Sequence, residues 1–200
     1  MLINIPLRLI FTTVIIFSSA SLFALDLNFP DRLQTPAKHF TGFEKTAFLN
    51  LTNVNDRIVT AGARGVIGFS DDGGETWRQS DVPVSTLITA IEFVSDNEAW
   101  AVGHSGAILH STDRAETWHL KLEGNQANQL VLEKSKNTLK NVTLDYEQAE
   151  GYEKEDLQYA VEDAEFALSN AKFDLELGPT YPFLDVLFLD KQRGFAIGAY

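Results

Sequence analysis

Two segments of the sequence, 41 residues apart, carry the same set of hydroxyl, carboxylate and indole side chains. The first set is Ser70, Asp72, Gly74, Thr76 and Trp77, and the second is Ser111, Asp113, Thr117 and Trp118. Oxygen atoms of this kind can bind a sugar or a metal ion. They can also accept the backbone N–H groups of their own turn. We favour the structural role, because the set occurs in each repeat whereas an active site occurs once.

The first set fits the Asp-box pattern S-x-D-x-G-x-T-W at every fixed position. The glycine of this pattern permits a positive φ, and the tryptophan covers the hairpin with a large apolar face. The second set departs from the pattern only at Ala115. Because alanine carries a Cβ, we expect a slightly different turn in the second copy.

Asp boxes also occur in sialidase-like glycan hydrolases, which makes an enzyme the alternative interpretation. Sialic acid chemistry needs a cluster of arginines with a tyrosine and an acid, and other glycosidases use a pair of carboxylates. Arg64 and Arg114 lie in turns of different repeats, and no third arginine of this kind is visible. We therefore predict no catalytic residues and no enzyme. The alternative is a hydrolase whose catalytic residues lie in further repeats.

Several other classes of site are excluded by composition and spacing. The chain has no cysteine, and its four histidines show no metal-ligand spacing, so we expect no metal. The glycines lie in repeated turns with no helix after them, so we expect no phosphate-binding loop, no cofactor and no small-molecule substrate. A net charge of −12, from 16 basic and 28 acidic residues, argues against nucleic acid as a partner.

The elements that position these residues form a repeat of short strands. Segments 57–77 and 98–118 align without a gap, and a third copy begins near Phe188. The pattern of apolar residues and turns predicts strands over 87–94, 98–102, 107–110, 116–120 and 184–189. Four strands in about 40 residues is typical of one blade of a β-propeller. The fold class is therefore mainly β, with about three blades present.

Segment 124–178 interrupts the repeat, and its apolar residues change to a spacing of three or four. One stripe predicts a helix over 153–175: Leu157, Ala160, Val161, Ala164, Leu168, Ala171 and Leu175. A second stripe predicts a partner helix over 128–147: Leu132, Leu139, Val142 and Tyr146. Residues 123–178 hold 13 Asp or Glu against 5 Lys. We prefer a solvated helical hairpin, with a docking arm for a basic or membrane-proximal partner as the alternative.

Residues 1–24 have the pattern of a signal peptide. Arg8 precedes an apolar run over 9–17, which is shorter than the ~20 residues that span a bilayer. Small residues follow, and Ala20 or Ala24 fits the position before a cleavage site. We expect an exported protein in the periplasm, the thylakoid lumen or the extracellular space.

The sequence thus divides into four parts. We predict a signal peptide at 1–24, two propeller blades at 40–122, an acidic helical hairpin at 123–180 and the start of a further blade at 181–200. The last residues stop inside a strand and turn whose earlier copies continue into an Asp box. The sequence therefore reads as an N-terminal fragment, with further repeats expected after Tyr200.

The repeats resemble the photosystem II stability/assembly factor-like family, whose units are related to bacterial neuraminidase (BNR) repeats. The resemblance covers 49–122 and 183–200, and its most specific part is the unit that ends in Trp100-Ala-Val-Gly103 and again in Phe195-Ala-Ile-Gly198. It implies a seven-bladed, exported, non-enzymatic propeller that binds protein partners of a membrane complex, with a role in photosynthesis through photosystem II. Propellers bind through turns at one face, which makes Arg64 and His104 the candidate contacts.

Overall fold

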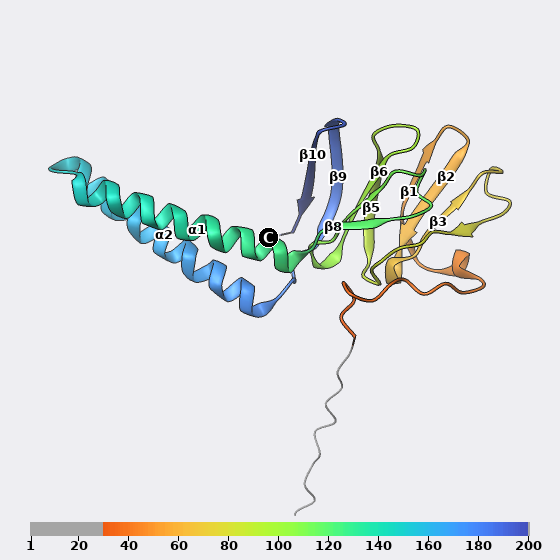
Figure 1. The fold of residues 1–200 in the computed structure, drawn as a ribbon, viewed down its shortest axis with the longest axis horizontal. Coiled ribbons are helices and arrows are strands. Elements are labelled where there is room, and N and C mark those ends of the chain that lie inside the picture. The colour runs from red at the N-terminus through yellow and green to blue at the C-terminus, as the bar shows by residue number, and fades with distance from the viewer. Residues whose placement is uncertain (1–29, 200) are drawn as a thin grey trace, which may run out of the picture.

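The computed structural model describes residues 30–199, which form a mainly β structure with two long helices (Figure 1). The first sheet has the order β1 (Phe48–Val54), β2 (Arg57–Gly62), β3 (Ile67–Ser70) and β4 (Arg78–Gln79). The second has the order β5 (Ile88–Phe93), β6 (Ala99–Gly103), β7 (Ile108–Ser111) and β8 (His119–Leu122). The third pairs β9 (Phe183–Asp190) with β10 (Arg193–Gly198). All pairings within these sheets are antiparallel.

Three short 3₁₀ turns and two helices complete the described part of the chain. The turns are η1 (Phe43–Lys45), η2 (Ala63–Gly65) and η3 (His104–Gly106), and the helices are α1 (Gly124–Gln148) and α2 (Tyr152–Leu177). The predicted signal peptide lies outside the described residues. Within the described residues, no helix combines the length and the apolar character needed to cross a membrane.

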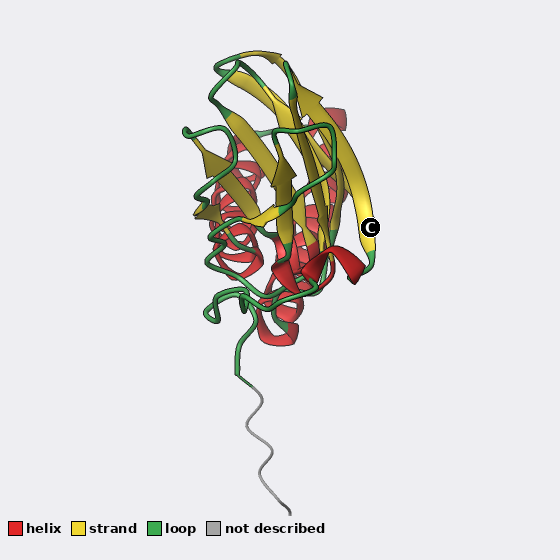
Figure 2. Ribbon diagram, turned by 90° about the vertical axis from the view of Figure 1, so that its right-hand side faces the viewer, coloured by secondary structure: helices red, strands yellow, loops and turns green. Residues whose placement is uncertain are grey.

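The three sheets lie side by side, with β1 beside β5 and β5 beside β9 (Figure 1). From the end opposite the helices, their strands overlap in successive layers (Figure 2). One apolar core joins the first two sheets, and its fully buried members include Val59, Ile67, Ile88 and Leu109. The registers repeat as well: Ala61 faces Ile67 in the first sheet, and Val102 faces Ile108 in the second. The repeat in the sequence is therefore also a repeat in the structure.

A close backbone contact explains why each repeat has glycine at the end of its second strand. The glycines and the residues that face them are Gly62 with Ala47, Gly103 with Leu87, and Gly198 with Pro182. A Cβ on these glycines would lie 2.1, 2.2 and 2.2 Å from the facing carbonyl oxygen. The residue after each glycine donates its N–H to that same oxygen, at 2.9, 2.8 and 3.3 Å. Any larger side chain would push the two segments apart.

The last strand of the second sheet begins later than predicted. The sequence pattern places it over 116–120, but β8 spans His119–Leu122. The preceding residues pair instead with Asp81, whose N–H donates to Glu116 O and whose carbonyl accepts from Trp118 N, both at 2.9 Å. A contact between segments of two repeats, which local patterning does not encode, therefore sets the start of this strand.

The two helices form an antiparallel hairpin that projects away from the sheets (Figure 1). They lie where the apolar stripes predict helices, and those stripes face each other: Leu132 of α1 and Ala164 and Ala171 of α2 are buried. The helix α1 begins earlier than expected because the Glu123 carboxylate caps it, accepting from Asn125 N at 2.9 Å and Gln126 N at 3.1 Å.

Candidate functional site

The first hairpin turn is closed by side chains of the Asp-box set. Ser70 Oγ donates to Asp72 Oδ1 at 2.7 Å and accepts from Gly74 N at 2.9 Å. Asp72 Oδ1 accepts from Thr76 N at 2.9 Å, and Trp77 Nε1 donates to Gly74 O at 3.0 Å. Every one of these hydrogen bonds is local to the turn between β3 and β4.

The second turn, between β7 and β8, repeats this arrangement. Ser111 Oγ donates to Asp113 Oδ1 at 2.8 Å and accepts from Ala115 N at 3.0 Å. Asp113 Oδ1 accepts from Thr117 N at 2.9 Å, and Trp118 Nε1 donates to Ala115 O at 3.2 Å. The same four hydrogen bonds therefore close both turns.

The expectation of a different second turn is wrong. Gly73 and Gly74 have φ of 76° and 94°, and Arg114 and Ala115 adopt the same left-handed region at 63° and 68°. A residue with a Cβ pays about 1–2 kcal/mol for this conformation. The shared hydrogen bonds offset this cost, so the second turn keeps the left-handed φ values and the hydrogen bonds of the first.

The carboxylates of both turns are stabilised in their ionised form. Hydrogen bonds from the Thr76 hydroxyl, the Thr76 N–H and Ser70 lower the pKa of Asp72 from 3.8 to about 2. Burial alone would raise the pKa of Asp113, but hydrogen bonds from Thr117 and Ser111 outweigh it and lower the pKa. Within residues 30–199, no group of three or more His, Asp or Glu side chains could hold a metal ion.

Arg57 joins the two repeats, a role that the sequence pattern did not indicate. Its side chain is 3% exposed, and Nε donates to Asp71 Oδ1 at 2.6 Å in its own sheet. Its Nη1 donates to Arg114 O at 2.9 Å and to Glu116 Oε1 at 3.0 Å, both in the turn between β7 and β8. Burial alone would lower the pKa of Arg57, but the two carboxylates outweigh it and raise the pKa. The guanidinium also lies 4.3 Å over the Phe69 ring.

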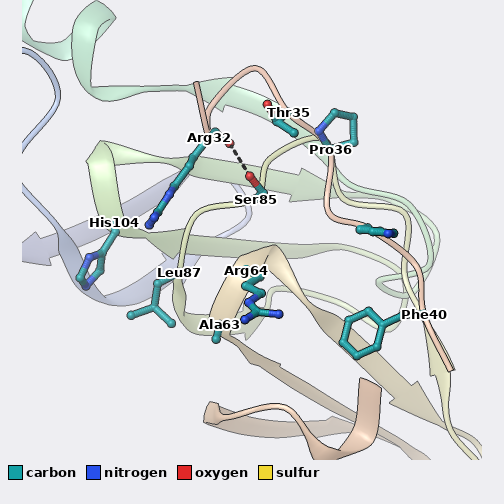
Figure 3. Close-up of a pocket in the computed structure, with 10 residues that line it drawn as sticks. Arg32, Thr35, Pro36, Phe40, Ala63, Arg64, Ser85, Leu87 and His104 are labelled. Carbon is teal, nitrogen blue, oxygen red and sulfur yellow. Dashed lines mark hydrogen bonds between the residues drawn. The ribbon is translucent and has the colours of Figure 1, made fainter. Parts of the chain in front are cut away.

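A groove of about 780 Å³ lies where residues 32–40 cross the turns of the first two sheets (Figure 3). Its lining residues are Arg32, Thr35, Pro36, Lys38, Phe40, Ala63, Arg64, Ser85, Leu87 and His104. The structure thus brings the two candidate contacts, Arg64 and His104, to one groove. They come from equivalent turns of neighbouring repeats, η2 and η3, which explains their proximity.

The backbone of residues 32–40 is fixed to the first sheet and to the link that follows it. Ser85 N donates to Arg32 O at 2.8 Å, and Ala37 N donates to Val82 O at 2.9 Å. Gln79 Nε2 donates to Lys38 O at 3.0 Å. These bonds hold the segment as one wall of the groove and place the Arg32 side chain near Ser85, Leu87 and His104 (Figure 3).

The turn that carries Arg64 holds a strained backbone. Arg64 has φ 59°, and Ser105, its counterpart in the second repeat, has the same value. Residues other than glycine rarely adopt this region, and the conformation costs about 1–2 kcal/mol. The conformation places the exposed Arg64 side chain at the groove.

The groove is basic, and its cationic side chains form no ion pair with the described part of the chain. Among the described residues, no carboxylate lies within ion-pair distance of Arg32, Lys38, Arg64 or His104. Three permanently positive side chains therefore line this groove, in a chain with a net charge of −12. Such a site favours an anionic ligand, and the apolar Phe40 gives it a surface for a nonpolar group. The sequence offered no signal for Arg32 and Lys38, because they precede the repeats.

Comparison with known proteins gives a distant likeness among solved structures. No family profile matches the chain, and no curated protein matches it. Among solved structures, the chain is similar to "YCF48 bound to D1 peptide", with 18% sequence identity and a TM-score of 0.42. The likeness covers 77% of this chain and 34% of that one, so the chain spans about a third of its length. We therefore derive the function from the groove itself.

Proposed function

We propose that the chain belongs to an exported, non-enzymatic scaffold or assembly factor that binds a protein partner of a membrane complex. In this proposal the basic groove is the binding site. The observation that carries it is that Arg32, Lys38 and Arg64 all line this groove without a carboxylate partner among the described residues. No cofactor, nucleic acid or small-molecule substrate takes part. Export to the periplasm, the thylakoid lumen or the cell exterior belongs to the same proposal.

The ligand that fits this groove is an anionic segment of a polypeptide. Asp or Glu side chains, or a terminal carboxylate, would form charge-assisted hydrogen bonds with the guanidinium groups of Arg32 and Arg64. An apolar side chain of the same segment would contact Phe40 and Leu87. A groove about 780 Å³ in volume, open to solvent and walled by a fixed segment, suits an extended peptide.

The sheets are proposed to be blades of a β-propeller. Three observations support this: the repeated strand order, the adjacency of β1, β5 and β9, and apolar residues exposed at both ends of the row of sheets. The exposed residues are Leu49 and Leu51 at one end, and Leu187, Phe195 and Ile197 at the other. Neighbouring blades cover such faces in a propeller. The resemblance implies seven blades in the closed ring.

The proposed division of the chain follows from this architecture. Residues 40–122 supply two blades, 123–180 an inserted acidic hairpin and 181–200 the start of a third blade. The Asp-box residues have a structural role, because the Asp72 and Asp113 carboxylates each accept backbone N–H groups of their own turn. In the alternative of a glycan hydrolase, the catalytic residues would lie in further repeats.

Peptide affinity tests the proposal directly. A short, fluorescently labelled peptide with several Asp and Glu residues and a free C-terminus would be titrated with the whole chain and with Arg32→Glu and Arg64→Glu variants. Reversal of either charge should weaken binding roughly tenfold or more, since it replaces attraction by repulsion. Lys134→Glu, on the exposed side of α1, makes the same charge change away from the groove and should leave the affinity unchanged.

Two results would count against the proposal. Equal weakening by all three variants would show that net charge, and not the groove, governs binding. Equal binding of a peptide with Lys and Arg in place of Asp and Glu would show that the groove does not select anions.

A further inference from the structure

The outer face of α2 carries an exposed row of aromatic side chains. Tyr152, Tyr159, Phe166 and Phe173 occur at intervals of seven residues, and they are 88%, 69%, 70% and 62% exposed. Isolated exposed aromatics are ordinary on a protein surface, but a regular row of four is an apolar surface that water covers at a cost. Nothing in the proposed function uses this row.

The row lies on the side of α2 that faces away from α1. Ala164 and Ala171 are buried against α1, and Phe166 and Phe173 follow them by two residues, which is about 200° around a helix. A spacing of seven residues drifts only ~20° per interval, so the four rings form a nearly straight ridge. Over 21 residues the ridge is about 32 Å long.

The excess of acidic residues in the hairpin lies on α2 and not on α1. The helix α2 has eight acidic residues against two lysines, whereas α1 has three of each. The acidic residues of α2 are Glu153, Glu155, Asp156, Glu162, Asp163, Glu165, Asp174 and Glu176. Four of them stand three or four positions from Tyr159, one helical turn away on either side. The ridge is therefore apolar along its crest, and its flanks are negative from Tyr152 to Phe166.

This combination selects among the partners that could cover the ridge. A second copy of the hairpin would place acidic flanks against acidic flanks, and an anionic lipid surface would be repelled in the same way. A helix with one apolar seam and Lys or Arg beside it satisfies both features, as interhelical pairs do in coiled coils. Its basic side chains can also lie over aromatic rings, as Lys154 does over Tyr146 at 4.9 Å.

We propose that the Tyr152–Phe173 ridge of α2 docks a basic amphipathic helix of a partner protein, as the third helix of a bundle. The partner helix has apolar residues on a seven-residue repeat over at least three repeats, and lysine or arginine at the flanking positions. This surface is separate from the basic groove and does not depend on it. The hairpin is thus a second docking element, for a partner of opposite charge to the ligand of the groove.

A selection experiment tests this inference. The whole chain would be immobilised and offered a displayed library of helical peptides of four heptads. Their seam positions vary among apolar residues and alanine, and their flanking positions vary among Lys, Arg, Gln, Glu and Asp. We expect enrichment of sequences with a heptad apolar seam and Lys or Arg flanks. Recovery of no peptide, of acidic peptides, or of basic peptides without a seam would overturn the proposal.

Variants of the hairpin locate the binding surface. Tyr159→Ala combined with Phe166→Ala should lower the affinity for the selected peptide roughly tenfold or more, because aromatic anchors dominate such interfaces. Leu130→Ala with Leu144→Ala makes a matched change at exposed residues of α1 and should leave the affinity unchanged. Circular dichroism should show equal helix content in both double variants. Equal affinity of the two would overturn the assignment to α2.

The competing occupants have their own measurements. Sedimentation should show a monomer at concentrations where the peptide binds. If the chain instead dimerises, and the Tyr159→Ala, Phe166→Ala variant does not, the occupant of the ridge is a second copy of this chain and not a helix of another protein. Cosedimentation with vesicles of zwitterionic lipid should be absent, and binding that depends on the same two residues would assign the ridge to a membrane surface instead. Arg64→Glu should leave binding of the helical peptide to the ridge unchanged. The proposed binding site in the groove and the proposed binding site on the ridge can therefore be refuted separately.

Discussion

The turn between β3 and β4 and the turn between β7 and β8 share one set of hydrogen bonds in different surroundings. The first turn is open to solvent, with Gly73 and Gly74 at its tip and nothing within 4 Å of a Cβ on Gly73. The second is packed against the first sheet: Ser80 Oγ donates to Ala115 O at 2.7 Å, and Trp118 is only 2% exposed. The four hydrogen bonds shared by the two turns, which we call the clamp, therefore form without burial. Burial of the second turn adds the packing that joins the repeats.

The largest difference between the two turns should appear at their tryptophans. Trp118→Ala removes a buried member of the shared core and should lower the free energy of unfolding by about 3–5 kcal/mol. Trp77→Ala, at a half-buried position, should lower it by about 1–2 kcal/mol. Urea denaturation of the two variants measures both values. Equal losses would mean that the tryptophans act only within their own turns.

Arg57 should give the next largest effect, because its hydrogen bonds connect the two repeats. Arg57→Ala removes hydrogen bonds to Asp71 and Glu116 and should cost about 2–3 kcal/mol of unfolding free energy. Arg78→Ala, which removes an exposed partner of Asp71, is the matched control and should cost about 0–1 kcal/mol. Equal effects of the two variants in urea denaturation would show that the hydrogen bonds of Arg57 between the repeats do not stabilise the fold.

Acid should destabilise the two turns, because their aspartate carboxylates have pKa values that are lowered in the folded state. The pKa of Asp72 falls from 3.8 to about 2 on folding, and the pKa of Asp113 is also lowered. The stability that these ionised carboxylates contribute is present above about pH 4 and is lost as the pH falls through the folded-state pKa. The melting temperature should fall between about pH 5 and pH 2.

The Asp72→Asn variant should show a shallower fall over the same interval, because asparagine has no proton to take up. Glu75→Gln, at an exposed neighbour whose side chain forms none of the clamp's hydrogen bonds, is the control and should keep the wild-type slope. Identical slopes for Asp72→Asn and the wild type would show that this carboxylate does not contribute.

The smallest effect concerns backbone strain. Arg114→Gly keeps the left-handed conformation without a Cβ and should stabilise the fold by up to about 1 kcal/mol, since relief of strain exceeds the added entropy of the unfolded glycine. Gly73→Ala, at the equivalent position of the first turn, should be destabilising by a similar amount. Thermal unfolding compares the pair, and shifts of the same sign would contradict this explanation.

Local patterns in the sequence predicted the local structure well. The strand repeat and both helices follow from residue spacing, and the glycines at repeat ends correspond to real close contacts such as that of Gly62. The late start of β8 and the early start of α1 were missed. The first depends on a contact with Asp81, which lies just after β4 of the first sheet, and the second on an unusual glutamate cap, Glu123.

The site was predictable only in part, because it combines residues that are distant in the sequence. Arg64 and His104 could be named from their equivalent turns. Arg32 and Lys38 lie before the repeats, and hydrogen bonds of their segment to Gln79, Val82 and Ser85 bring them to the groove. The role of Arg57 was hidden for the same reason: its partner Glu116 is 59 residues away.

We propose above all that residues from two repeats and the segment before them form one groove for an anionic peptide. The most direct measurement is NMR titration of the isotope-labelled chain with the acidic peptide. We predict that the largest amide shift changes occur at residues 32–40, 63–65, 85–87 and 104–106, and that Arg64→Glu removes them. Shift changes confined to the helices or the outer strands, or no change at saturating peptide, would contradict the claim.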